Sequence, residues 1–363
     1  MLRKNSTSYF LLFLAAIFIL TTAQSCIRIR KKNEVPVTTD GGLYVTSNQG
    51  DSWDTLNDVL SVAGGVNLNT ADIEDIIFDP NDVDTMYVLT SAQGAFLSLN
   101  KGKSWMLIES LGSKVTNLVV HPTDPCTVYA SSGNRLLKST DCLRNFDEVF
   151  HTELAARPIG AIAIDPKNHN KIYASTFSQL FQSNDAGNSW NSNGFFGSQI
   201  TEILTRTVFG TGLVYLVTTE DSIWKSENSG GDWENMEENL TKFKAPVKEE
   251  IQFFSFDESG ENALIVQGGH RFFRSFNGGA DWSRVALISS PSTIHSIAVD
   301  PRDAKKIFYT TSNTFYQSLD GGVNWTTKDI PIGPRIAKKL IFDTINPTIL
   351  YLASWQAPQP KKK

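Results

Sequence analysis

The sequence is poor in the residues that usually mark a metal site, a membrane span or a nucleic-acid surface. Its 363 residues include only three cysteines and five histidines, and the histidines have none of the close spacings of metal ligands. Nothing in the formal net charge of −5 suggests binding to nucleic acid. The apolar run at residues 10–20 is shorter than the roughly 20 residues that a membrane-spanning helix needs. We therefore expect no cofactor, no bound metal and no nucleic-acid partner.

What the sequence has in abundance is a repeated turn motif. Apolar residues make up 40% of the chain, which is too apolar for a disordered protein. The pattern S-x-[DN]-x-G-x-x-W begins at residues 46 (with Thr), 98, 183, 226, 275 and 318. A seventh copy, at residues 139–146, has Leu143 in place of the glycine and Phe146 in place of the tryptophan. The aromatic positions are 41 to 52 residues apart, a spacing typical of the blades of a β-propeller.

Each residue type in the motif has a structural role in a tight turn. The Asp or Asn can accept backbone N–H groups, the Ser or Thr hydroxyl can bond within the same hairpin, and glycine supplies a positive φ. The tryptophan is expected to fill the gap beside the neighbouring blade. Because most copies carry Asn, the motif is a poor calcium site. The residues predicted to be structural are Asn48, Trp53, Asn100, Trp105, Asp141, Asp185, Trp190, Asn228, Trp233, Asn277, Trp282, Asp320 and Trp325.

The segments around each turn predict a four-stranded blade, with strands A to D. The stretch "AIAIDPKNHNKIYAST" at residues 161–176 is typical of a strand, an Asp-Pro turn and a second strand, and a third strand precedes the motif. The N-terminal piece supplies only strands C and D, and the C-terminal piece supplies only strands A and B. The sequence therefore predicts an all-β protein, a seven-bladed β-propeller of antiparallel blades that is closed by a two-plus-two latch.

The seven turns resemble the Asp-box, or bacterial neuraminidase repeat, and the resemblance covers about residues 41–354. Families with this repeat include sialidases, xyloglucan-type glycoside hydrolases, sortilin-like receptors and the assembly and stability factors of photosystem II. The resemblance implies that the boxes lie at the C-to-D turns, away from the functional face. In repeat length, blade number and export signal the chain is similar to the photosystem II assembly factor group. A shared repeat indicates the fold and leaves the function open.

The ends of the chain differ from the repeats. Residues 1–25 resemble a bacterial export signal, and Cys26 resembles the lipidated cysteine of a lipoprotein, although Ala23 stands where such signals usually have leucine. We expect a signal at 1–25, a basic linker at 26–40, the propeller at 41–355 and a basic, disordered tail at 356–363. These features predict a lipid-anchored protein on the extracytoplasmic side of a bacterial envelope, with an uncleaved N-terminal anchor or secretion as alternatives. The basic ends would bind anionic lipid or serve only as solubilising tails.

The other two cysteines lie in the repeat that lost its glycine and tryptophan. Cys126 is expected to begin a B strand and Cys142 to lie in the C-to-D turn, so antiparallel pairing would bring them to the same end of one blade. A disulfide there would stabilise the blade by about 2–3 kcal/mol. Two buried free thiols are the alternative.

The sequence does not favour an enzyme. Eight of the nine tyrosines fall in predicted B or C strands and no Arg-Ile-Pro motif precedes the first box, so sialidase chemistry is not expected. Hydrolysis by a carboxylate pair would need acids on the D-to-A loops. The candidates are Asp72, Glu74, Glu153, Glu249 and Glu250, for which solvated loop acids are the alternative interpretation.

The functional face is expected opposite the boxes, where the D-to-A and B-to-C loops meet. The candidate contacts with a partner are Arg135, Arg157, Phe195, Phe196, His270, Arg271 and Arg335. We therefore predict a non-catalytic, monomeric scaffold that binds a protein partner in the cell envelope. The alternative is a glycan-active protein, either an Asp-box glycoside hydrolase or a lectin.

Overall fold

The computed structural model describes residues 41–60, 67–153, 157–208, 210–219, 223–236, 251–256, 263–267, 271–288 and 293–356, with backbone alone for 251–256 and 263–267. The chain divides into two compact units, Met1–Pro36 and Val37–Lys363. The predicted signal, Cys26, the basic linker, His270, Glu249, Glu250 and the tail after residue 356 lie outside the described residues.

The described part of the second unit is all-β and contains seven four-stranded antiparallel sheets. The first sheet comprises β3 (Ile73–Phe78), β4 (Met86–Thr90), β5 (Gly94–Ser98) and β6 (Met106–Leu107), and the second comprises β7 (Val115–His121), β8 (Asp124–Ser132), β9 (Arg135–Ser139) and β10 (Asp147–His151). The third comprises β11 (Ile159–Ile164), β12 (Ile172–Thr176), β13 (Gln179–Ser183) and β14 (Asn191–Phe195), and the fourth comprises β15 (Ile200–Val208), β16 (Thr211–Thr218), β17 (Ile223–Ser226) and β18 (Glu234–Asn235).

The last three sheets complete the set. The fifth comprises β19 (Ile251–Phe256), β20 (Ala263–Gln267), β21 (Arg271–Ser275) and β22 (Ser283–Arg284), and the sixth comprises β23 (Ser296–Asp300), β24 (Asp303–Thr310), β25 (Thr314–Ser318) and β26 (Thr326–Asp329). The remaining sheet, here the shared sheet, has the order β2 (Asp54–Thr55), β1 (Leu43–Thr46), β28 (Leu350–Trp355), β27 (Ile336–Phe342). Two short 3₁₀ helices, η1 (Leu68–Thr70) and η2 (Glu109–Leu111), lie in loops.

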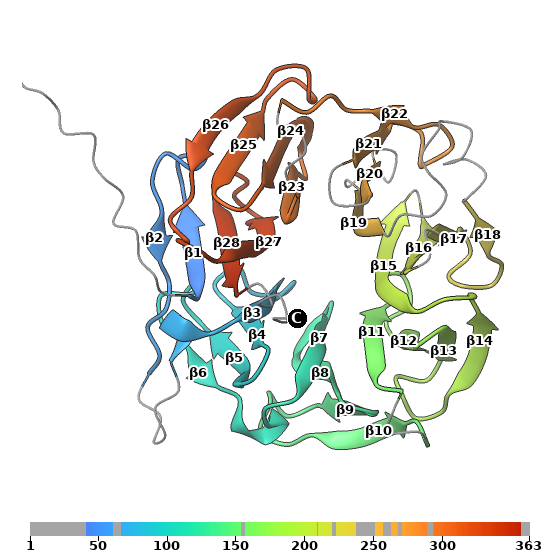
Figure 1. Ribbon diagram of the computed structural model, residues 1–363. Helices are drawn as coiled ribbons and strands as arrows, with labels where there is room; N and C mark the ends of the chain where they lie inside the picture. The colour runs from blue at the N-terminus through green and yellow to red at the C-terminus, as the bar shows by residue number, and fades with distance from the viewer. Residues whose placement is uncertain are drawn as a thin grey trace, which may run out of the picture. The chain divides into compact units, whose positions relative to one another are not determined.

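The shared sheet joins strands from both ends of the described chain. β1 pairs with β28 in antiparallel register, from Leu43 opposite Ala353 to Thr46 opposite Leu350. Figure 1 shows the sheets of this unit following one another around a common centre, with β3, β7, β11, β15, β19, β23 and β27 innermost. These seven strands are called the inner strands below.

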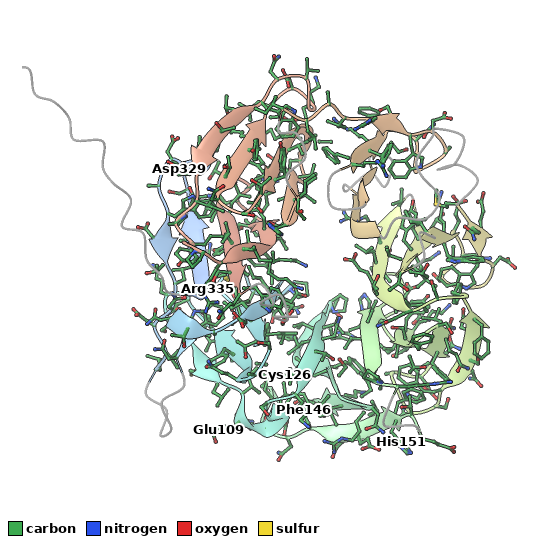
Figure 2. The ribbon with its side chains drawn as sticks, in the orientation of Figure 1. Glu109, Cys126, Phe146, His151, Asp329 and Arg335 are labelled. Carbon is green, nitrogen blue, oxygen red and sulfur yellow. A yellow bond between two sulfur atoms is a disulfide. The ribbon has the colours of Figure 1, made fainter. Side chains whose placement is uncertain are left out.

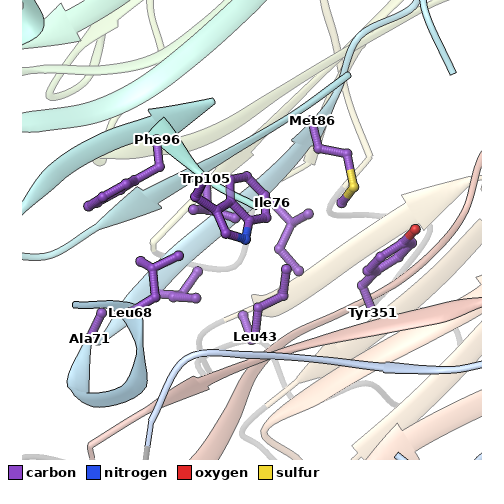
Figure 3. Close-up of a cluster of buried hydrophobic side chains, with 11 residues drawn as sticks. Leu43, Leu68, Ala71, Ile76, Met86, Phe96, Trp105 and Tyr351 are labelled. Carbon is purple, nitrogen blue, oxygen red and sulfur yellow. The ribbon is translucent and has the colours of Figure 1, made fainter. Parts of the chain in front are cut away.

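Hydrophobic cores lie between successive sheets. Leu43 of β1, Ile76 of β3 and Tyr351 of β28 belong to one buried cluster around Trp105, which joins the shared sheet to the first sheet (Figure 3). Comparable clusters join each sheet to the next, and the last joins the sixth sheet to the shared sheet. The predicted B-strand tyrosines are buried in the second strands, at Tyr87, Tyr129, Tyr173, Tyr215, Tyr309 and Tyr351, each at most 2% exposed. Their assignment to structural positions is therefore confirmed.

All seven box turns make the same two hydrogen bonds. In the turn at 183–190, Ser183 Oγ accepts from the Gly187 N–H at 2.8 Å, and Asp185 Oδ1 accepts from the Ser189 N–H at 2.8 Å. The equivalent bonds occur in the other six turns. Leu143 adopts a φ of 69° where the other copies have glycine, a conformation that costs a residue with a Cβ. These contacts and the positive φ of the turn glycines are the ones that the sequence predicts for the hydroxyl, the carboxyl or amide, and the glycine.

Four of the six box tryptophans donate a hydrogen bond to the preceding sheet, whereas Trp282 donates within its own turn, to the Gly279 carbonyl. The indole N–H of Trp105 donates to the Leu56 carbonyl at 2.7 Å, that of Trp190 to Val149 at 3.0 Å, and that of Trp325 to Ala286 at 2.9 Å. The side chain of Phe146 has no N–H group, so it cannot make this bond. In the same sheet, Cys126 and Cys142 form a disulfide with a Cα–Cα distance of 3.9 Å. Figure 2 labels Cys126 and Phe146 in this second sheet. The cross-link therefore lies in the one repeat that lacks both the turn glycine and the tryptophan.

Candidate functional site

The two ends of every sheet carry different connections. In the third sheet, Ile159 pairs with Thr176, Thr176 with Gln179, and Gln179 with Phe195. The start of the inner strand, the turn between the second and third strands, and the end of the fourth strand therefore lie together, and this is called the loop end. The opposite end, where the box turns lie, is called the box end.

The structure places the described candidate residues at the loop end. Arg135 begins β9, Arg157 precedes β11, and Phe195 ends β14. Arg271 begins β21 and is partly buried. Of these, Arg135, Arg157 and Phe195 are exposed, Phe195 to 69%. They form the accessible part of the predicted surface.

Phe196 is not available to a partner, so its prediction as a contact residue was wrong. Its side chain is only 5% exposed. The ring packs edge-on against those of Trp224 and Trp233, with centroid distances of 5.2 Å to each. The chain turns this aromatic residue into the core between the third and fourth sheets and leaves its neighbour Phe195 outside.

Arg335 is likewise a structural residue, because it is 9% exposed and bound on several sides. Its guanidinium lies 2.6 Å from Asp72 Oδ1 and donates to the Thr70 carbonyl at 3.1 Å. Asp72 also accepts from the Gln356 N–H at 2.8 Å. Figure 2 shows Arg335 where the shared sheet meets the first sheet. The predictions of Arg335 as a partner contact and of Asp72 as a free loop acid are therefore wrong.

Phe177 is an exposed aromatic residue that the sequence analysis missed. It lies in the turn between β12 and β13, is 53% exposed and has a φ of 51°, which is unusual for a bulky side chain. Its carbonyl accepts from the Ile200 N–H at 2.8 Å, and the next carbonyl accepts from the Phe196 N–H at 2.9 Å. The turn is thus bonded to the segment that follows Phe195. An aromatic residue between two predicted strands was the signal available in the sequence.

Most inner strands carry an irregularity near the loop end. In six of the seven, the register with the second strand shifts there, at Ile73/Asp75, Val115/Asn117, Ile159/Ile162, Ile200/Glu202, Ile251/Phe253 and Ala337/Lys339. A β-bulge places extra residues on one strand and re-aims their side chains. Bulges at equivalent positions thus bring side chains from several sheets toward one point.

These bulges supply the polar lining of a cavity of about 540 Å³. Residues in or next to β3, β7, β15, β16, β23 and β27 line it, with Trp355 at the end of β28. We name it the channel-mouth cavity. The bulge residues that line it are Glu74, Asp75, Asn117, Thr201, Glu202, Lys338 and Lys339. Glu74 was predicted as a loop acid but belongs to β3.

Two ion pairs cross from the shared sheet to the first sheet inside this cavity. Lys339 Nζ lies 2.9 Å from Asp75 Oδ1, and Lys338 Nζ lies 3.5 Å from Glu74 Oε2. The nearby Asp75 carboxylate raises the pKa of Lys339, so its ammonium stays charged. Lys338 Nζ also lies 5.2 Å from the centroid of the Trp355 ring. The lysines are therefore already engaged on the first-sheet side.

Glu202 reaches the cavity from the fourth sheet. Burial raises the pKa of its carboxyl to about 7, an effect that Lys339 reduces and Asp75 increases. His295, on the wall near β23, has its pKa lowered by burial, and its Nε2 lies 3.3 Å from Ser312 Oγ. Sequence analysis missed Glu202, Asp75 and Lys339. The sequence did contain a sign of them, because charged residues stand near the start of A strands that are otherwise apolar.

The remaining predicted sites have no comparable surroundings. Glu153 is exposed at the loop end and does not line the cavity. Within the described ranges, no group of three or more His, Cys, Asp or Glu side chains could hold a metal ion. In the same ranges, no helix has the length and apolar character to cross a membrane.

Comparison with known proteins shows structural similarity alone. No family model and no curated protein matches the sequence. The crystal structure of a GH74 enzyme from Niastella koreensis matches with a TM-score of 0.62 and 18% identity over 83% of this chain and 53% of the enzyme. YCF48 bound to a D1 peptide matches with a TM-score of 0.58 and 15% identity over 78% of this chain and 93% of YCF48.

A third similar structure is the extracellular domain of a putative one-component system from B. thetaiotaomicron, with a TM-score of 0.60 and 14% identity over 85% of this chain and 39% of that one. The chain spans about half the length of the GH74 enzymes that it matches. Together with the four-stranded sheets, these similarities show a β-propeller fold. At such identities they show nothing further about activity.

Proposed function

We propose that the chain is a seven-bladed Asp-box propeller that binds a protein partner at its loop end and catalyses no reaction. The blade number and the closure are supported by the seven hydrophobic cores, which link each sheet to the next and the sixth to the shared sheet. The pairing of β1 with β28 supports the two-plus-two latch. The repeated hydrogen bonds of the box turns support the assignment to the Asp-box repeat.

The exposed aromatic pair at the loop end of the third sheet carries the proposal. Phe177 and Phe195 are 53% and 69% exposed, and backbone hydrogen bonds hold their segments together. Arg157 lies at the same end of this sheet, and Arg135 at the loop end of the second sheet. Aromatic residues and arginine are enriched where proteins bind one another. Aromatic rings bury much surface with little loss of side-chain entropy, and arginine offers a planar set of hydrogen-bond donors. YCF48, which shares the fold, has been seen with a bound peptide.

The acids of the loop end support binding rather than hydrolysis. Asp72, Glu74 and Asp75 each lie against an arginine or a lysine of the shared sheet. These contacts commit the three carboxylates to the shared sheet, whereas hydrolysis of a glycoside needs two carboxyl groups that face the substrate.

A glycan-active protein is the second candidate, and Glu202 is the observation that favours it. A carboxyl with a raised pKa in a cavity is the state required of a general acid. Release of reducing sugar from a xyloglucan oligosaccharide, lost in Glu202→Gln, would establish this alternative and refute the non-catalytic proposal.

We also infer an envelope location for the mature protein, held by lipid on Cys26. The export-type sequence at 1–25 supports this. The similar domain from B. thetaiotaomicron is described as extracellular, which is compatible with it. Metabolic labelling with an alkynyl fatty acid tests the anchor, because Cys26→Ser should abolish the label.

Site-specific crosslinking tests the proposed surface. A photoreactive p-benzoylphenylalanine at position 195 is compared with one at position 319, because Leu319 is 53% exposed at the box end. After irradiation in native membranes, we expect one or a few defined adducts from position 195. None of these adducts should form from position 319. The same set of adducts from both positions, or none from position 195, would refute the proposed surface.

A further inference from the structure

The channel-mouth cavity contains one acid without a basic partner. Its lining includes the acids Glu74, Asp75 and Glu202 and the bases Lys338 and Lys339. The lysines pair with the two acids of β3, at 3.5 and 2.9 Å. The carboxyl group of Glu202 makes no ion pair or hydrogen bond among the described residues. With all three acids ionised, the lining has one negative charge more than its positive charges.

The surroundings of Glu202 explain why this charge is costly. The β27 lysines face it together with Asp75 and Glu74 from β3. Burial lowers the pKa of His295, which lies just before β23, so this side chain stays neutral. The β7 and β16 walls contribute Asn117 and Val217, which carry no charge. The only basic groups that face an ionised Glu202 are therefore lysines that already form ion pairs with other acids. A positive charge entering the cavity would complete its neutralisation.

We propose that the channel-mouth cavity binds the ammonium or guanidinium group of a basic side chain, with Glu202 as its counter-ion. This inference rests on the proposed function, since the side chain would belong to the partner protein. The cavity has the volume of a small-ligand site. Its position at the loop end places it on the same end as Phe177 and Phe195. The partner would thus cover the aromatic pair and insert one basic side chain into the cavity.

Proton linkage gives this site a signature that a structural carboxyl would not have. The pKa of the free Glu202 carboxyl is about 7, so near neutral pH it is partly protonated. A bound cation favours the ionised form and lowers that pKa, so binding releases part of a proton. Affinity for a cation should therefore rise about tenfold between pH 6 and pH 8, as the ionised fraction rises.

Calorimetric titration of the full chain tests the proposal without any partner. The probe is Nα-acetyl-lysine amide, and Nα-acetyl-norleucine amide is its neutral match. We expect the lysine probe to bind more tightly than the norleucine probe, with proton release seen as a dependence of the heat on buffer ionisation enthalpy. Glu202→Gln should weaken the lysine probe by about tenfold or more and remove the pH dependence. Glu153→Gln, which alters an exposed acid of the loop end outside the cavity, is the control.

Several outcomes would overturn the proposal. They are equal affinity for both probes, an unchanged lysine affinity in Glu202→Gln, and a pH-independent affinity in the unmodified protein. Butylammonium provides a further arm, because tighter binding of this small amine than of the lysine probe would identify a free amine as the ligand and reject the partner side chain. The crosslinking from position 195 is independent of these titrations, so the surface and the cavity can fail separately.

Discussion

The box end and the loop end differ in how closely one sheet repeats the next. At the box end, all seven turns make the same pair of hydrogen bonds, even where Leu143 replaces glycine. At the loop end the side chains change from sheet to sheet, with Phe177 and Phe195 on the third sheet and Arg335 buried beside the shared sheet. The box turn is repeated because each sheet needs the same connection between its third and fourth strands. The proposed site for a partner lies where the repeat is broken.

The largest expected effect is at the box end, in Trp105→Ala. This indole is fully buried between the first sheet and the shared sheet and donates to the Leu56 carbonyl. Removing it leaves a cavity and an unpaired carbonyl, so the free energy of unfolding should fall by about 4 kcal/mol. Urea unfolding measures this, with the exposed Leu319→Ala as the control. If the variant binds the lysine probe less well at unchanged stability, the box end takes part in binding and the assignment of a purely structural role to it is wrong.

The disulfide of the second sheet should have the next largest effect. Cys126 and Cys142 are 16 residues apart and connect the one box that lacks glycine and tryptophan. Replacing both by serine should lower the free energy of unfolding by about 3 kcal/mol, because the closed loop restricts the unfolded chain. Intact mass with and without reductant should differ by two hydrogen atoms. An unchanged mass would show that the thiols are free.

The box end could be predicted from the sequence because its information is local and repeated. Seven similar octapeptides gave the turns, and alternating apolar residues gave the strands. The terminal strands could be paired because each end of the chain lacked what the other supplied. Phe195 and Phe196 could not be told apart, since the chain's path after β14 decides which one faces the core.

The cavity could not be predicted for a different physical reason. A bulge reverses which side chains face inward, so the alternation of apolar residues in the A strands no longer identifies the facing set. Lys339 forms an ion pair with Asp75, and Arg335 forms one with Asp72. Arg335 and Asp72 are 263 residues apart in the sequence. Such long-range pairs follow from the order of sheets. Burial raises the pKa of Glu202, and the Lys339–Asp75 pair modifies that effect, with Lys339 lowering the pKa and Asp75 raising it.

The smallest expected effect concerns the acids of the box turns. Hydrogen bonds from the Ser189 hydroxyl and N–H lower the pKa of Asp185 to about 2, and those from Asn324 do the same for Asp320. Because the folded-state pKa lies below that of the unfolded chain, these carboxylates stabilise the fold above about pH 4, and the contribution is lost as the pH falls toward 2. Asp185→Asn combined with Asp320→Asn should therefore remove part of the acid-induced fall in melting temperature. Differential scanning calorimetry between about pH 5 and about pH 2.5 measures the change.

The box of the first sheet, at residues 98–105, supplies the matched control for this prediction. Asn100 makes the same contacts with neutral groups, since its Nδ2 donates to Ser104 Oγ at 2.8 Å and its Oδ1 accepts from the Ser104 N–H at 2.9 Å. Asn100→Asp should create a carboxylate like that of Asp185 and make the melting temperature more sensitive to acid, with no change in affinity for the lysine probe. The two substitutions should thus shift the acid sensitivity in opposite directions. If both shift it the same way, or if either alters probe binding, the boxes contribute more than a turn and the contrast between the two ends no longer holds.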